Sequence, residues 1–275
     1  MNKKIPKIAC IVMASGEGKR FGARKGGKLL APLGGVPVLE RVLRALPAEE
    51  FCKIVVVTRW PEVEALCRRM KISCVRHDRP LRSDTIREGM RAIIGGGLDH
   101  FNDQIRGDKQ LVSGNLRNSN ELGHPHKPDA CLFVAGDQPL LTGESVRRMV
   151  QTWIQAYSEG RKAVVRLGWK QEAGNPVLFP ADMFDALCSL EGNRGGASLL
   201  RSMEGKQGDA GLACSAEGKQ GGADLACSAE GKQSDAGLER SEGMEVLIVE
   251  AGSPYELMDV DTPEALAELA EVVLE

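Results

Sequence analysis

Residues 12–35 read VMASGEGKRFGARKGGKLLAPLGG, a glycine-rich and basic stretch that follows the apolar run 8–12. A short β-branched run that ends at a glycine loop is typical of a buried parallel strand. Small residues let backbone N–H groups approach a phosphate closely, and arginine or lysine adds localised positive charge. The stretch therefore predicts a phosphate-binding loop at the carboxyl end of a first strand.

Two common phosphate-binding loops fit this stretch poorly. The P-loop pattern G-x-x-x-x-G-K is met from Gly22 to Lys28, but Leu29 stands where a serine or threonine should hold Mg²⁺. The dinucleotide fingerprint would place Phe21 at its third glycine, and no acidic residue follows the strand predicted at 53–58. A P-loop NTPase and a Rossmann dehydrogenase are therefore both weak interpretations.

Apolar strands and amphipathic helices alternate outward from the loop. Further strands are expected at 53–58, 73–76, 130–135 and 245–249, and helices at 36–46, 61–70, 84–94, 142–157 and 263–274. We expect Ser83 or Asp84 to cap the third of these helices and Thr262 to cap the last. The alternation predicts an α/β fold, Rossmann-like, with a mostly parallel twisted sheet and helices on both faces.

A second polar loop follows the strand expected at 130–135, where the sequence continues GDQPLL. Ligands of such sheets bind at the carboxyl ends of the strands. The glycine loop and the GDQP stretch are therefore expected to share one site.

Two segments interrupt the alternation. Residues 100–127 are polar and aperiodic, which predicts a surface insertion. Within 202–243 a unit of 13 residues repeats as SMEGKQGDAGLAC, SAEGKQGGADLAC and SAEGKQSDAGLER. Each copy has too few apolar residues to offset the entropy of ordering it, so we expect a flexible insertion within a single domain that spans 1–275.

The composition excludes several classes of protein. A net charge of −2 gives no basic field for nucleic acid, and no apolar run reaches the roughly 18 residues of a membrane span. The eight cysteines form no C-x-x-C pair, and His124 and His126 have no third metal ligand in view. We therefore expect a cytoplasmic protein without disulfides, nucleic-acid partners or membrane contact.

The glycine loop resembles the signature of the nucleotidyltransferases that activate sugars, isoprenoid alcohols and molybdopterin, roughly A-[AS]-G-x-[GS]-x-R-[MF]-G followed by lysine. Here it reads ASGEGKRFG at 14–22 with Lys28 beyond it. Four further motifs are GDQP at 136–139, GNPVLFP at 174–180, GNRGG at 192–196 and LMDVDTPE at 257–264. Together they resemble the molybdenum cofactor cytidylyltransferases, with Asn175 where that family has histidine.

The resemblance implies a fold of the nucleotide-diphospho-sugar transferase type and a Mg²⁺-dependent reaction. A nucleoside monophosphate, CMP in preference, would move from the triphosphate to the phosphate of molybdopterin or the molybdenum cofactor, releasing pyrophosphate. Further partners would be a molybdoenzyme or its chaperone. The alternatives are a GTP-using guanylyltransferase, an enzyme acting on a sugar or alcohol phosphate, and a regulatory protein that only binds nucleotide.

The same resemblance implies roles for particular residues. Arg20, Lys28 and Asp137 would be catalytic. The nucleotide would contact Met13, Ala14, Ser15, Gly16, Glu17, Gly18, Lys19, Arg20, Lys28, Thr58, Arg59, Ser83, Thr85 and Gly89. The acceptor would contact Gln138, Pro139, Gly174, Asn175 and Pro176.

Two assignments stay open at this point. Mg²⁺ prefers carboxylate oxygens together with phosphate oxygens and water. Asp137 follows a strand and is the first candidate ligand, but only one of Asp259 and Asp261 can point inward if their segment is extended. The insertion ARKGG at 23–27 also leaves open whether Lys25 or Lys28 contacts the phosphates.

Overall fold

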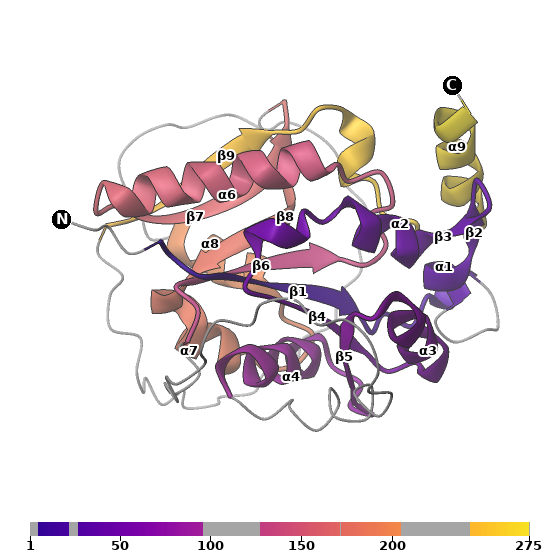
Figure 1. Ribbon diagram of the computed structural model, residues 1–275, viewed down its shortest axis with the longest axis horizontal. Helices are drawn as coiled ribbons and strands as arrows, with labels where there is room; N and C mark the ends of the chain where they lie inside the picture. Colours follow the sequence, from indigo (N-terminus) through magenta and orange to yellow (C-terminus); the bar gives the residue numbers. More distant parts are fainter. Residues whose placement is uncertain (1–4, 22–26, 96–126, 171, 205–242, 275) are drawn as a thin grey trace, which may run out of the picture.

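A seven-stranded sheet forms the centre of the molecule (Figure 1). The structure is a computed structural model that describes residues 5–21, 27–95, 127–170, 172–204 and 243–274. The strand order is β5-β4-β1-β6-β8-β7-β9. The strands are β1 Ile8–Ala14, β4 Lys53–Thr58, β5 Ser73–Arg76, β6 Ala130–Ala135, β7 Lys162–Trp169, β8 Glu172–Pro180 and β9 Met244–Glu250.

The sheet is mostly parallel, as the sequence predicts. β1 pairs in parallel with β4 and β6, β4 with β5, and β7 with β9, whereas β8 runs antiparallel to both β6 and β7. β1 and β6 therefore end at the same edge of the sheet, and Met13 lies opposite Ala135 in the register. The glycine loop and the GDQP loop leave the sheet side by side.

Helices cover both faces of this sheet (Figure 1). On one face lie α2 Val38–Ala45, α3 Pro61–Met70 and α6 Gly143–Ser158; on the other lie α4 Arg82–Ile94, α7 Phe184–Cys188 and α8 Gly196–Glu204. Short segments complete the chain: α1 Gly27–Leu30, η1 Lys19–Phe21, η2 Ala48–Glu50, η3 Ala181–Met183 and η4 Pro254–Leu257.

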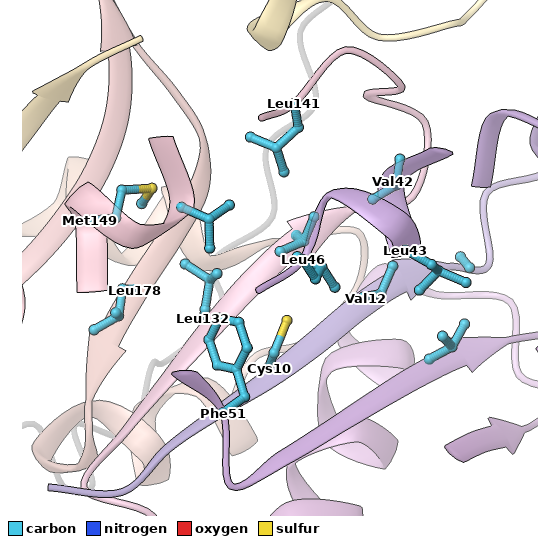
Figure 2. Packing of buried hydrophobic residues seen from close by; sticks show 14 of the residues in the cluster. Cys10, Val12, Val42, Leu43, Leu46, Phe51, Leu132, Leu141, Met149 and Leu178 are labelled. Carbon is cyan, nitrogen blue, oxygen red and sulfur yellow. The ribbon is translucent and has the colours of Figure 1, made fainter. Parts of the chain in front are cut away.

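The core divides into two layers because successive side chains of a strand point to opposite faces. From β1, Cys10 and Val12 enter the layer beneath α2 and α6, where Figure 2 shows Leu46 and Phe51 close to Cys10. Ala9 and Ile11 enter the layer beneath α4 and α7. Both layers are fully buried and hold the strand ends in fixed positions.

A small hairpin replaces the start of the helix expected at 36–46. β2 Pro32–Leu33 and β3 Val36–Pro37 pair through a two-residue turn, and α2 begins only at Val38. Both turn residues, Gly34 and Gly35, have positive φ angles of 57° and 77°. Two central residues with positive φ match the tight turns that connect antiparallel strands, for which a Gly-Gly pair is a strong signal. The helix is confirmed, but its start was predicted two residues too early because the prediction read only the helical spacing.

The helix ends give mixed results. Thr262 caps α9 Pro263–Leu274 as predicted, since its Oγ1 accepts a hydrogen bond from Ala265 N at 3.2 Å. The cap proposed for α4 was wrong: the helix already begins at Arg82, and Asp84 lies in its first turn. There the Asp84 carboxylate accepts a hydrogen bond from Leu81 N at 3.3 Å, which satisfies a free donor at the helix start.

The two predicted insertions fall almost entirely outside the described residues. α8 extends to Glu204, so the helix includes the first three residues of the segment assigned to the repeat. Within the described ranges no helix is both long and apolar enough to span a membrane. The six cysteines in those ranges are all free thiols, and four of them are buried.

Candidate functional site

A cavity of about 640 Å³ opens where the carboxyl ends of β1 and β6 meet the starts of α4 and α8. Residues of the glycine loop, the GDQP loop and the segment after η4 line it. Residues of β8 and of the loop before α8 line it as well. Every motif singled out in the sequence therefore contributes to the wall of a single cavity.

The glycine loop is held by its neighbours in a defined shape. Gly18 has a φ of 58°, a conformation in which a side chain is strained, and its carbonyl accepts a hydrogen bond from Phe21 N at 2.8 Å. The indole Nε1 of Trp60 donates to the Gly16 carbonyl at 3.1 Å. Thr58 is fully buried, and its hydroxyl donates to the Ala14 carbonyl at 2.8 Å. Thr58 and Trp60 thus fix the loop from beneath.

The GDQP loop approaches the end of β1 closely. Gly136 N donates to the Met13 carbonyl at 3.0 Å, and a Cβ on Gly136 would lie only 3.0 Å from the same oxygen. A side chain there would force the Met13 carbonyl to shift by a few tenths of an ångström, so glycine favours this close approach of the two loops. This close approach places the Asp137 carboxylate directly beside the glycine loop.

Lys28 joins three segments that are distant in the sequence. Its ammonium donates to Asp137 Oδ2 and, at 2.9 Å, to Asp261 Oδ1. Asp261 lies in addition 4.0 Å from Arg20 Nη1. The Lys28 side chain is 7% exposed, so the ammonium is held in a largely desolvated position between two carboxylates.

Asp259 and Asp261 both line the cavity, which corrects the expectation that only one could point inward. The expectation assumed an extended segment. Instead, Asp261 N donates to the Asp259 carbonyl at 3.1 Å, and the tight bend brings both side chains to the same side. Val260 between them is buried, and its N–H donates to the Asp137 carbonyl at 2.8 Å. We call Lys28, Asp137, Asp259 and Asp261 the charged wall.

The charged wall shifts the pKa values of its members. Burial lowers the pKa of Lys28, but its attraction to Asp137 and its hydrogen bonds outweigh this effect and raise the pKa overall. The hydrogen bond from Lys28 lowers the pKa of Asp261. Burial and repulsion from Asp137 and Asp261 raise the pKa of Asp259 to about 6. The wall therefore holds more negative charge than Lys28 alone neutralises.

A histidine links the glycine loop to α4. His77 Nε2 lies 3.1 Å from Ser15 Oγ and 3.2 Å from Thr85 Oγ1, and both of these residues line the cavity. Burial lowers the pKa of His77, which favours the neutral ring. The sequence analysis missed His77, because it lies alone after a short strand and belongs to no motif.

A second group of described lining residues carries no acidic side chain and differs in chemistry. Asn175 projects from β8, with Val177 and Phe179 beyond it on the same strand. Asn193 and Gly195 come from the loop before α8. We call these five residues the neutral wall. Amide and apolar groups together suit the body of an organic ligand rather than a triphosphate.

Comparison with known proteins identifies the family. The sequence profile of the MobA-like NTP transferase domain matches residues 10–208. The chain belongs to this family. It is therefore an NTP-dependent nucleotidyltransferase. A search of the curated proteins found no match.

Solved structures agree with this family in fold. A nucleotidyl transferase from Methanothermobacter is 22% identical, with 98% of each chain covered and a TM-score of 0.60. A CMP:2-keto-3-deoxy-manno-octonic acid synthetase in complex with CTP is 14% identical, with 98% of each chain covered and a TM-score of 0.54. Rv0371c from Mycobacterium tuberculosis, in complex with manganese, is 15% identical, with 96% of this chain and 98% of that chain covered and a TM-score of 0.52. These likenesses confirm the predicted fold class.

Many residues to which the sequence analysis gave a role line the cavity of this nucleotidyltransferase. They are Met13, Ser15, Gly16, Glu17, Lys28, Thr85, Asp137, Asn175, Asp259 and Asp261. Arg20 lies beside the cavity through its contact with Asp261, and Arg59 pairs with Glu17 at 3.2 Å. Lys19 begins η1 next to Gly18.

Other predicted site residues lie beneath the cavity. Ala14, Thr58 and Ser83 are buried, and a Cβ on Gly89 would lie 2.9 Å from Ile11. The buried Gln138 donates from Nε2 to the Leu257 carbonyl at 3.1 Å, and a Cβ on Gly174 would meet Leu257 as well. Pro139 and Pro176 are also buried. In this structure these residues support the loops instead of facing a ligand.

The charged wall fits a divalent cation, although among the described residues no ready-made group of three acidic, histidine or cysteine side chains forms a metal site. The Lys28 ammonium marks a position where Asp137 and Asp261 already hold a positive charge. Asp259 lies near enough to both carboxylates to raise its own pKa. Carboxylate oxygens are the ligands that Mg²⁺ and Mn²⁺ prefer.

Proposed function

We propose that this nucleotidyltransferase transfers CMP from CTP to the phosphate of molybdopterin or the molybdenum cofactor, with Mg²⁺ as its metal. One observation carries the proposal. Lys28 of the glycine loop, Asp137 of GDQP and Asp261 of the DVDTPE segment meet at one point of the cavity. Asn175 of GNPVLFP faces the same cavity. The motifs that resemble the cytidylyltransferases thus converge on one site.

In this reaction the acceptor phosphate attacks the α-phosphorus of CTP. A new P–O bond forms, and the bond from the α-phosphorus to the bridging oxygen breaks, so its electron pair leaves with pyrophosphate. The acceptor dianion carries no proton on its attacking oxygen, so no general base is needed. The task of the protein is to position two anions and to offset their charge.

The residues of the site match this task. The backbone N–H groups of the glycine loop, Arg20 and Lys28 would hold the triphosphate. Asp137, Asp259 and Asp261 would hold Mg²⁺, which when bound supplies positive charge beside the α-phosphate and leaving group. The homologous fold that binds manganese supports a divalent metal here.

The nucleoside would lie on the side of Ser15 and Thr85, whose hydroxyls His77 connects. These small polar groups suit hydrogen bonding to a pyrimidine or its ribose. The relative that is complexed with CTP supports cytidine as the base. A molybdoenzyme or its chaperone would then receive the dinucleotide product.

The test is a nucleotide panel. Pyrophosphate release is measured with Mg²⁺ and each of CTP, GTP, ATP and UTP, with and without molybdopterin. We expect release that requires molybdopterin and is fastest with CTP. A preference for GTP would indicate a guanylyltransferase. Pyrophosphate release only after a sugar or alcohol phosphate is added would identify that compound, and not molybdopterin, as the acceptor. Nucleotide binding without release under any condition would favour a regulatory protein.

A further inference from the structure

The proposed reaction brings two phosphates together, so each needs a positive charge near it. Among the described residues that line the cavity, only Lys28 and Arg82 are basic. Lys28 is bound to two carboxylates of the charged wall. Arg82 is thus the basic lining side chain that is left for a second phosphate.

The position of Arg82 is fixed by the elements around it. It is the first residue of α4, and Ser83 N next to it donates to the Gly192 carbonyl at 3.2 Å. Its side chain runs along Gly195, where a Cβ would lie 3.1 Å from Arg82 Cδ and 3.6 Å from Nη1. The helix start and the loop before α8 together hold the guanidinium at the neutral wall.

Arg82 carries the second positive charge in the lining of the cavity. No ion pair with an acidic side chain engages Arg82 within the described part of the chain. A guanidinium fork matches the oxygens of a phosphate.

We propose that Arg82 binds the phosphate of the acceptor, and that the body of the acceptor lies along the neutral wall. The acceptor is then a phosphomonoester with a partly apolar body that carries hydrogen-bonding groups for the amides of Asn175 and Asn193. This assignment rests on the proposed nucleotidyl transfer to a phosphate, and not on which phosphomonoester is used.

In the transfer step, Arg82 would hold two oxygens of the acceptor dianion while the third attacks the α-phosphorus. The P–O bond to the β-phosphate breaks, and pyrophosphate leaves on the side of Arg20 and Lys28. The acceptor brings two negative charges and CTP four; the product diphosphate carries two and pyrophosphate four. The attacking phosphate would therefore be bound by Arg82, and the leaving pyrophosphate by Arg20 and Lys28.

Steady-state kinetics with CTP, Mg²⁺ and molybdopterin test this assignment. Arg82→Gln should raise the KM for molybdopterin about tenfold to a hundredfold, as expected for a lost hydrogen bond to a charged group. The KM for CTP should stay within about twofold. Arg82→Lys should restore part of the loss, because it keeps the charge but not the fork. The control is Arg79→Gln, since Arg79 lies three residues away and pairs with Glu88.

A second measurement is independent of the identity of the acceptor. Inorganic phosphate is titrated into the protein saturated with Mg²⁺ and α,β-methylene-CTP. Wild type and Arg79→Gln should bind phosphate equally, and Arg82→Gln at least tenfold more weakly. Equal phosphate binding in wild type and Arg82→Gln, no binding to wild type, or a matching rise in the KM for CTP would overturn the assignment. If wild type shows no turnover with molybdopterin, this result would contradict the proposed function but not the assignment of Arg82.

Discussion

The two walls of the cavity are built in different ways. The charged wall is assembled by contacts between residues far apart in the chain: Lys28 reaches partners 109 and 233 positions away. The neutral wall comes from one strand and one loop, β8 and the residues before α8. Charge stabilisation depends on few residues with strict geometry, whereas recognition of an organic body spreads over several weak contacts. The two walls should respond differently to substitution.

The largest effect is expected at the charged wall. Asp137→Asn keeps the size of the side chain but removes the charge that faces Lys28 and the metal position. Turnover should fall by about a hundredfold or more, comparable to the loss of one preorganised electrostatic contact. Higher Mg²⁺ or Mn²⁺ should restore part of it. The measurement is steady-state pyrophosphate release, with a melting curve to confirm that the fold is intact.

The matched control is Asp182→Asn, because Asp182 is an exposed aspartate that pairs with Lys162 on the surface. It should leave turnover unchanged. Near-normal turnover in Asp137→Asn would show that the charge of Asp137 is not needed for the reaction. The functional distinction between the two walls would then be wrong.

The next effect concerns nucleotide affinity. Arg20 is 76% exposed and lies 4.0 Å from Asp261, at the edge of the charged wall. Arg20→Ala should weaken CTP binding about tenfold, the lower range for a lost charged hydrogen bond at a solvated position. Lys25 lies outside the described residues; we expect Lys25→Ala to have a smaller effect than Arg20→Ala, since Lys28 already contacts the carboxylates of the charged wall. The check is calorimetric titration with CTP; an equal loss for Lys25→Ala would contradict the position assigned to the phosphates.

A smaller effect is expected at the neutral wall. Asn175→Ala removes an amide that lines the cavity, and the loss of one neutral hydrogen bond should raise the KM for the acceptor about twofold to tenfold. The turnover number and the KM for CTP should not change, because this wall contacts neither the triphosphate nor the metal position. A fall in the turnover number as large as that of Asp137→Asn would show that the walls are not separate.

The smallest effect concerns the pH dependence of stability. The pKa of Asp259 is raised to about 6 in the folded state, above the ordinary value of 3.8. The folded protein thus binds this proton more readily than the unfolded chain, so ionised Asp259 destabilises the fold at neutral pH. Asp259→Asn should raise the melting temperature by about one or two degrees at pH 7.5 in the absence of metal. The gain should shrink as the pH falls through 6 and vanish near pH 4.

Melting curves between pH 4 and 8 check this, with Asp182→Asn as the control. A gain that is constant over the whole range would mean that the repulsion from Asp137 and Asp261 is not its cause. Added Mg²⁺ should reverse the order by stabilising wild type more than Asp259→Asn, because the metal offsets that repulsion.

The sequence predicted most of the charged wall; for the neutral wall it predicted Asn175 and the motifs GNPVLFP and GNRGG, without the shape of the loop before α8. Apolar strands that end in glycine or aspartate show where β1 and β6 stop, so Lys28 and Asp137 could be placed together from local patterns. The bend that turns both Asp259 and Asp261 inward depends on a backbone hydrogen bond that no spacing shows. Their roles as metal ligands stay predictions.

The remaining errors have physical reasons. The turn at Gly34 and Gly35 was not predicted, because the residues after it have helical spacing. The strands β7 and β8 were not predicted either. Arg82 was not assigned to the site from the sequence, because its place there comes from the loop at Gly195, more than a hundred positions away. The contact of Gln138 with the acceptor stays a prediction; its Nε2 donates to the Leu257 carbonyl, a contact that the sequence did not indicate. Long-range contacts of this kind leave no periodic signal.

The contact between Lys28 and Asp261 can form only after nearly the whole chain has been synthesised. The ribosome adds Lys28 early, and its second carboxylate partner is translated 233 residues later. Val260, whose N–H joins Asp137, and α9, which packs Leu269 against Leu33 and Val38, arrive at the same late stage. A nascent chain that stops before this segment can already form β1, β4 and β6, but it lacks half of its charged wall. A chain that ended there would lack Asp259 and Asp261, two of the four residues of the charged wall.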